Sequence, residues 1–455
     1  MRRPPGSFEY PIQPSLTGWR GATRSLRHRQ FRWIYASNIT FFFAMNGQML
    51  VRSVLTFDLT GSALSLGLVN LAVAIPMLLV SPFGGVMSDR LERRMVIVAG
   101  QALLLAGEIV VFVLYVTGAL EFWHLMGTAF FMGCVFPFVM PARSAIVANV
   151  VGRDGLANAM ALQMGGMNAA RVVGPVTAGF LIFLVEIRGA YLVAIILYTV
   201  ALLAMTRIDR SPPDPDRPQR TVLGDLVDGV RYVAGDPPVR ALMLLGIVPI
   251  LLAMPFQSLL VVFAEDVWDV GSAGLGLLQA AAGLGGVAGS VYVAFHAETG
   301  RRARLMMASL LGFGGTLLLF ALSPWFLLAL PLVLIADVFA SVFQTLNSTA
   351  IQVLIPDHVR GRVMSLMMMT FGLTPLGTLP VSAMAEAWGA PVAVGIACLA
   401  TLVLAALFFA FSRSLRGIDR YCAEAIEQDR SGSGAPPTMT GGPPGAPSPA
   451  IPATP

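Results

Sequence analysis

Twelve apolar segments, each long enough to cross a lipid bilayer, restrict the possible folds of this chain more than any other feature. They run at 32–57, 64–87, 95–117, 125–146, 158–183, 188–206, 241–264, 273–295, 305–323, 325–354, 363–386 and 390–411. A spanning helix needs about 20 mainly apolar residues. Inside lipid, only a helix or a closed barrel satisfies every backbone polar group. The sequence therefore predicts an all-α integral membrane protein with twelve transmembrane helices.

The composition agrees with a chain that faces lipid over most of its length. Hydrophobic residues make up 56% of the sequence and charged residues only 12%, whereas a soluble domain is about 25% charged. The three cysteines and four histidines show no spacing typical of a disulfide or a metal site, so we expect no metal and no cofactor. The first apolar segment is too long for the core of a signal peptide, and we expect no cleaved signal.

The arginines predict how the chain is oriented. All the basic residues are arginines, and nearly all lie at or near one face of the predicted membrane domain. Arg188 is the exception in an outer loop, and Arg52 and Arg171 fall inside segments. Basic residues in membrane proteins concentrate on the cytoplasmic side. We therefore expect a multi-pass protein of the inner cell membrane with both termini in the cytoplasm, and no nucleic-acid partner despite the net charge of +5.

A long central loop and an internal repeat predict two six-helix halves. AIVANVVGRDGLANAMAL at 145–162 and AIQVLIPDHVRGRVMSL at 350–366 join the fourth to the fifth segment of each half, and duplicated halves are common in transporters. The expected parts follow one another along the chain. They are a cytoplasmic segment (1–30), a first bundle (31–206), a linker with an amphipathic helix (207–240), a second bundle (241–413) and a tail (414–455) that is disordered after about 431.

The sharpest motif follows the second segment. Gly85 is followed by Asp89-Arg90 and then by the basic pair Arg93-Arg94. This pattern resembles the loop 2–3 signature of the major facilitator superfamily. The resemblance implies a central cavity between the two halves and a cytoplasmic gate formed by these five residues. The alternative is a positive-inside signal without a gating role.

A second resemblance lies in the fifth segment. Gly174-Pro175 with Gly179 is similar to the Gly-Pro signature of antiporters and exporters in the superfamily. The resemblance implies a helix that seals the substrate path, and the alternative is a kinked packing helix. Pro141–Ala145 and Arg360–Gly377 resemble the branch that contains the enterobactin exporter and related bacterial drug exporters.

Few ionisable residues lie inside the segments, and each is expensive in lipid. The candidates for proton coupling or substrate binding are Asp337, Arg52, Glu108 and Arg171. In the superfamily the first, fourth, seventh and tenth spans line the cavity, which favours Asp337 and Arg52. Glu108 is then a packing or lipid-facing residue, and Arg171 is alternatively its counter-charge. Asp337 is alternatively held by Gln344 or a backbone partner.

These observations predict a secondary active transporter, because the sequence has no Walker-type nucleotide-binding motif. We expect a monomeric multidrug transporter that exports small, fairly apolar, drug-like or siderophore-like compounds by proton antiport with alternating access. Its partners are then the small-molecule substrate, protons and the bilayer. An uptake system or a lipid transporter on the same scaffold is the alternative. A membrane-embedded enzyme is disfavoured because no catalytic constellation is present.

Overall fold

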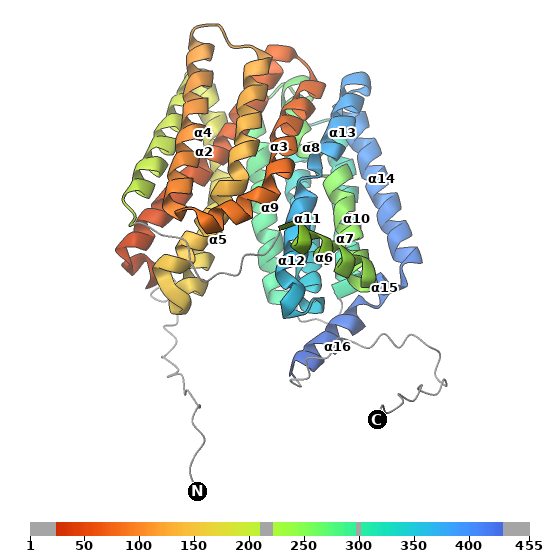
Figure 1. Cartoon of the computed structure of the whole chain (residues 1–455). Coiled ribbons are helices and arrows are strands. Elements are labelled where there is room, and N and C mark those ends of the chain that lie inside the picture. Colours follow the sequence, from red (N-terminus) through yellow and green to blue (C-terminus); the bar gives the residue numbers. More distant parts are fainter. Residues whose placement is uncertain (1–23, 210–221, 297–301, 431–455) are drawn as a thin grey trace, which may run out of the picture.

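The computed structural model describes residues 24–209, 222–296 and 302–430. Within these ranges the chain is helical and contains no strand, which confirms the all-α prediction. The long helices run side by side between two ends (Figure 1). We call the end where α16 lies the base and the opposite end the distal end.

The first group of helices comes from residues before 207. After the short 3-10 helix η1 (Arg24–Arg27), it consists of α2 (Arg29–Thr60), α3 (Ala63–Arg90), α4 (Arg93–Val116) and α5 (Phe122–Thr206). A straight helix of 85 residues would be about 130 Å long. Instead α5 doubles back, and Glu186 within it has a left-handed backbone with φ 59°. The three predicted segments between 125 and 206 therefore share one continuous element.

The second group follows α6 (Val222–Gly235), the amphipathic helix expected in the linker. It consists of α7 (Pro237–Leu252), α8 (Phe256–Val262), the π-helix η2 (Phe263–Val267), α9 (Gly271–His296), α10 (Arg302–Ala321), α11 (Phe326–Leu354), α12 (Asp357–Phe371), α13 (Thr374–Trp388) and α14 (Ala390–Phe411). The short helix α15 (Arg413–Arg416) and α16 (Ile418–Arg430) end the described chain. In Figure 1 this group lies beside the first, and the two groups contact each other mainly through α5 with α9 and α3 with α13.

Two predicted segments are interrupted in the structure. The segment at 241–264 breaks between α7 and α8, where Pro255 lacks an N–H and the Met254 amide donates to the Pro249 carbonyl at 2.8 Å. The segment at 363–386 breaks between α12 and α13, one residue before Thr374-Pro375. The hydropathy pattern predicted continuous helices here, because hydropathy does not register where backbone amides change from the α-helical acceptor to another one.

Side chains at the base hold the peripheral helices against the second group. The Asp236 carboxylate accepts a hydrogen bond from the Val239 amide at 3.1 Å and caps α7. Arg362 of α12 pairs with Asp228 of α6 at 3.4 Å. The Asp419 carboxylate of α16 accepts a hydrogen bond from the Ala303 amide at the start of α10, at 3.1 Å. The predicted irregular linker at 211–220 and the tail after 431 lie outside the described residues.

Candidate functional site

Asp337 lies in the middle of α11 and is buried. Its side chain is 5% exposed, and its Oδ2 atom has no hydrogen-bond partner. Helix α9 packs closely here because Gly285 has no side chain: a β-carbon on Gly285 would lie 3.0 Å from the Asp337 β-carbon. Asp337 and Gln344 are not hydrogen-bonded to each other, and Oδ2 has no backbone partner either, so neither of the two partners considered from the sequence holds this oxygen. Asp337 thus carries a carboxylate oxygen with no partner, at the contact of α9 and α11.

Arg171 brings a charge from the first group of helices towards Asp337. It is exposed on α5, and α5 contacts α9 at this level, since a β-carbon on Gly283 would lie 3.2 Å from Val172 Cα and 3.5 Å from the Arg171 carbonyl oxygen. Gly283 lies two residues before Gly285, the glycine that contacts Asp337, so α9 meets Arg171 and Asp337 at neighbouring positions. The two side chains do not come within 4.0 Å and do not form an ion pair. Arg171 and Asp337 thus carry opposite charges on the two helix groups and form no ion pair with each other.

Arg52 and Glu108 form a buried ion pair between α2 and α4. Arg52 Nη2 lies 3.1 Å from Glu108 Oε1, and the two side chains are 12% and 9% exposed. Gln48 Nε2 donates to the other Glu108 oxygen. Glu108 is therefore buried and not lipid-facing, and its partner is Arg52, so the alternative that Arg171 is its counter-charge was wrong. A single sequence could not identify the partner, because Arg52 lies near the distal end of α2 and the two positions are far apart in the chain.

A narrow pocket, with room for about one water molecule, borders this ion pair. We call it the Arg52 pocket. Its lining comes from α2, α4 and two separate stretches of α5. The residues are Phe41, Met45, Gln48, Met49, Arg52, Leu104, Glu108, Met132, Phe136 and Tyr198. The pocket therefore combines sulfur-containing and aromatic walls with one polar side.

Arg143 is a buried cation that the sequence analysis did not single out as a site residue. It is 1% exposed, and its Nη1 donates to the Asn38 side-chain oxygen of α2. Its guanidinium carbon lies 4.1 Å from the centre of the Phe41 ring, while its Nε and Nη2 atoms have no partner. The residue falls near the end of the apolar segment 125–146, where an arginine is easily taken for a loop residue.

The Gly-Pro motif lies where α5 contacts two other helices. A β-carbon on Gly174 would lie 3.0 Å from the Phe43 carbonyl oxygen of α2. On the other side, a β-carbon on Gly276 of α9 would lie 3.1 Å from the Pro175 carbonyl oxygen, and one on Gly179 would lie 2.6 Å from the Ser272 carbonyl oxygen. These three motif residues let α2, α5 and α9 approach to backbone distance.

The loop 2–3 motif is described only in part. Helix α3 runs through Gly85 and Asp89 to Arg90, but the side chains of these residues are outside the described set. Arg93 is buried, and its Nε has no partner. Arg94 Nη2 donates to the Thr206 carbonyl oxygen at 2.8 Å and ties the start of α4 to the end of α5. The gating role of this motif stays a prediction.

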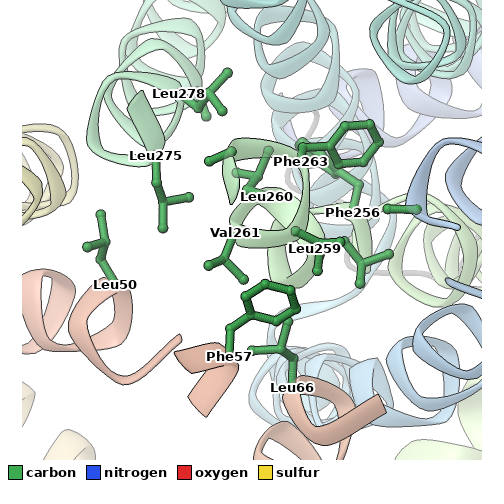
Figure 2. Close-up of a cluster of buried hydrophobic side chains, with 14 of the residues drawn as sticks. Leu50, Phe57, Leu66, Phe256, Leu259, Leu260, Val261, Phe263, Leu275 and Leu278 are labelled. Atoms are coloured by element: carbon green, nitrogen blue, oxygen red, sulfur yellow. The ribbon is translucent and has the colours of Figure 1, made fainter. Parts of the chain in front are cut away.

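The distal end is closed by a hydrophobic cluster that joins both helix groups. Figure 2 shows Leu50, Phe57 and Leu66 of α2 and α3 turned towards side chains of α8, η2 and α9. Polar contacts cross the same boundary. The Glu386 carboxylate of α13 accepts hydrogen bonds from the Ser62 hydroxyl at 3.0 Å and the Leu64 amide at 3.3 Å. Apolar packing and hydrogen bonds thus hold the two helix groups together at the distal end in this conformation.

Comparison with known proteins gives matches to membrane transporters. The family model described as "Transmembrane secretion effector" matches residues 21–428. The enterobactin exporter EntS of Shigella boydii is 28% identical over 324 residues, which cover 70% of this chain and 73% of EntS. EntS of Escherichia coli O139:H28 is 27% identical over the same coverage.

Solved structures share the fold at low sequence identity. The nucleoside transporter NupG superposes with a TM-score of 0.71 at 12% identity, covering 84% of this chain and 98% of NupG. A bacterial homolog of the human lysosomal transporter Spinster, in an inward-facing and unoccupied conformation, gives a TM-score of 0.65 at 16% identity, covering 87% of this chain and 98% of the homolog. These two likenesses concern the fold alone.

Proposed function

The chain belongs to the transmembrane secretion effector family of major facilitator superfamily transporters, and we propose that it exports small, fairly apolar organic compounds by proton antiport. It is a multi-pass membrane transporter and not an enzyme. The enterobactin exporters among its relatives support the outward direction and a drug-like or siderophore-like substrate. Alternating access between the two ends is the mechanism that we propose for it.

We also propose twelve spans in two halves, 31–206 and 241–413, around a central cavity. In the described residues, nine segments are long and apolar enough to cross a membrane. Three further spans complete the set. They are α2 with its 32 residues, the second part of the 49-residue segment Asn158–Thr206 once it is divided at Glu186, and the interrupted pair α12–α13.

The base is the cytoplasmic end in this proposal. Helices α6, α15 and α16 lie there (Figure 1), and α15 and α16 carry Arg413, Arg416 and Arg420. Arg188 follows the turn at Glu186 near the distal end. The positive-inside rule then places both termini in the cytoplasm. We propose that a monomer in the inner membrane is the working unit.

The observation that supports proton antiport is the unpartnered carboxylate of Asp337 opposite Arg171. When Asp337 is ionised, Arg171 attracts it across the contact between the two helix groups. When Asp337 holds a proton, that attraction is lost. The proton occupancy of one group would thus change how the halves hold together, which is the requirement for coupling a proton to a conformational cycle.

Proteoliposomes with an imposed proton gradient test this role. Asp337→Asn keeps the shape and removes the charge, so it should abolish uphill transport while downhill exchange of substrate continues. Asp269→Asn is the matched control, because Asp269 lies near the distal end with a left-handed backbone, φ 51°, that asparagine also tolerates. Uphill transport by the Asp337 variant at the wild-type rate would exclude Asp337 as the coupling group. Substrate accumulation in inside-out vesicles separates export from uptake.

A further inference from the structure

We propose that the Arg52 pocket binds the acidic head group of the transported compound, so that the preferred substrates are monoanionic amphiphiles such as carboxylates or phenolates with an apolar body. This inference rests on the proposed export function and names its substrate class. It makes Arg52 the residue that binds the acidic group, at a place separate from the proton-coupling carboxylate of α11.

Arg52 has hydrogen-bonding capacity that the structure leaves unused. A guanidinium carries five N–H donors in a planar fork that suits a carboxylate or another multidentate acceptor. The acceptors of Arg52 are one oxygen of Glu108 at 3.1 Å and the sulfur of Met132 at 3.5 Å. A thioether is a weak acceptor. An incoming acid could replace the Met132 contact while Glu108 stays in place.

The rest of the pocket suits an apolar body of variable shape. Met45, Met49 and Met132 line it together with Phe41 and Phe136. Methionine side chains are unbranched and adapt to different neighbours, and their sulfur atoms make favourable contacts with aromatic rings. Met49 is 54% exposed, so the pocket is open at the wall that Met49 forms. The pocket can therefore widen around a substrate by moving flexible side chains.

The charge inside this group of helices favours an anion over a cation. Among the described residues around the pocket, the charged side chains that are buried or nearly buried are Arg52, Glu108 and Arg143, whereas buried Arg93 lies about 22 Å from Glu108 along α4. Arg143 lies directly behind the pocket, because its guanidinium faces the Phe41 ring that forms part of the lining. Positive charges thus outnumber the one carboxylate. An anionic head group lowers this imbalance, whereas a cationic one increases it.

Glu108 competes with a bound acid for the same guanidinium. Two negative groups beside one cation repel each other, so the affinity for an acid is lower while Glu108 is charged. Replacement of Glu108 by glutamine removes that repulsion and keeps the shape of the side chain. The proposal therefore makes opposite predictions for the two members of the ion pair.

Equilibrium binding to the full chain in lipid nanodiscs tests the proposal with three fluorescent probes of one shape: 1-naphthoate, 1-naphthamide and 1-naphthylmethylammonium. We expect naphthoate to bind at least about ten-fold more tightly than the other two. Glu108→Gln should raise the naphthoate affinity. Arg188→Gln changes an exposed arginine at the distal end and should leave it unchanged.

The variant Arg52→Gln should remove the preference for naphthoate. This variant leaves the charge of Glu108 buried without a partner and can fail to fold. The double variant Arg52→Gln/Glu108→Gln replaces both charges by amides and avoids that problem. A preference for naphthoate that persists in the double variant would overturn the proposal, as would tighter binding of the ammonium probe by the wild type. Arg52-dependent binding of naphthoate without gradient-driven transport would instead contradict the proposed export function alone.

Discussion

Replacing Gly179 with alanine tests whether the close approach of α5 and α9 keeps the distal end shut. The new β-carbon would lie 2.6 Å from the Ser272 carbonyl oxygen and 3.1 Å from Gly276 Cα. Real β-carbons essentially never come within 3.0 Å of another heavy atom, so the helices must separate by the difference of about 0.4 Å. Both neighbours are backbone atoms, and no flexible side chain can turn away to make room.

The effect of Gly179→Ala on the free-energy difference between the open and closed conformations can be worked out from its effect on each of them. Overpacking of this kind costs about 1–3 kcal/mol, and it acts only while α5 and α9 are in contact. The gain in helix propensity on replacing glycine by alanine, about 0.8–1.0 kcal/mol, is the same in both conformations and cancels. The population ratio of open to closed molecules should therefore rise about 5- to 150-fold.

A buried reporter near the contact measures this ratio. Leu275 of α9 is fully buried in the closed cluster, so a cysteine there reacts with a membrane-impermeant maleimide only when the distal end opens. In a background without the native cysteines, Leu275→Cys should label faster when Gly179→Ala is added. Gly286→Ala is the control, because a β-carbon there meets no atom within 4 Å. Equal labelling rates in the two variants would refute the reasoning.

Three further predictions concern other parts of the structure. Asp236→Ala should lower the thermal stability of the purified protein by the loss of the α7 cap, about 0.5–2 kcal/mol, while Asp236→Asn keeps the cap and the melting temperature. Glu386→Ala removes the acceptor of two hydrogen bonds across the distal end and should speed the same maleimide labelling, whereas an unchanged rate would mean that the hydrophobic cluster closes this end alone. Asp89→Asn should slow transport at normal membrane levels and with substrate binding retained, and normal transport by this variant would leave loop 2–3 as a topology signal only.

Much of the fold could be predicted because hydropathy depends only on the local sequence. The segments at 64–87 and 95–117 match α3 and α4 within a few residues. The breaks in the segments at 241–264 and 363–386 could not be predicted in this way. They depend on where individual backbone amides find acceptors, as the bond from Met254 to Pro249 shows.

The sequence predicted which residues belong to the candidate site better than it predicted which of them contact each other. The cost of burying charge singled out Asp337, Arg52, Glu108 and Arg171 without a structure. The pairing of Glu108 with Arg52 depends on the rotation of α2 against α4, which a single sequence does not encode locally. Arg143 was overlooked as a site residue for a related reason, since its burial comes from Phe41 and Asn38 on another helix.

The interruption between α7 and α8 has a mechanical consequence for the distal end. Pro255 lacks an N–H, and the amides beside it depart from the α-helical pattern. Met254 donates to the carbonyl five residues back at 2.8 Å and Phe256 to the one three residues back at 3.2 Å, so the hydrogen-bond ladder between α7 and α8 loses its regular spacing. The joint is a place where the segment can bend, so the short stub made of α8 and the π-helix η2 is the part that we expect to move relative to α7. Opening the distal end would then move this stub as well as separate α5 from α9, so the residues around Pro255 contribute to the barrier.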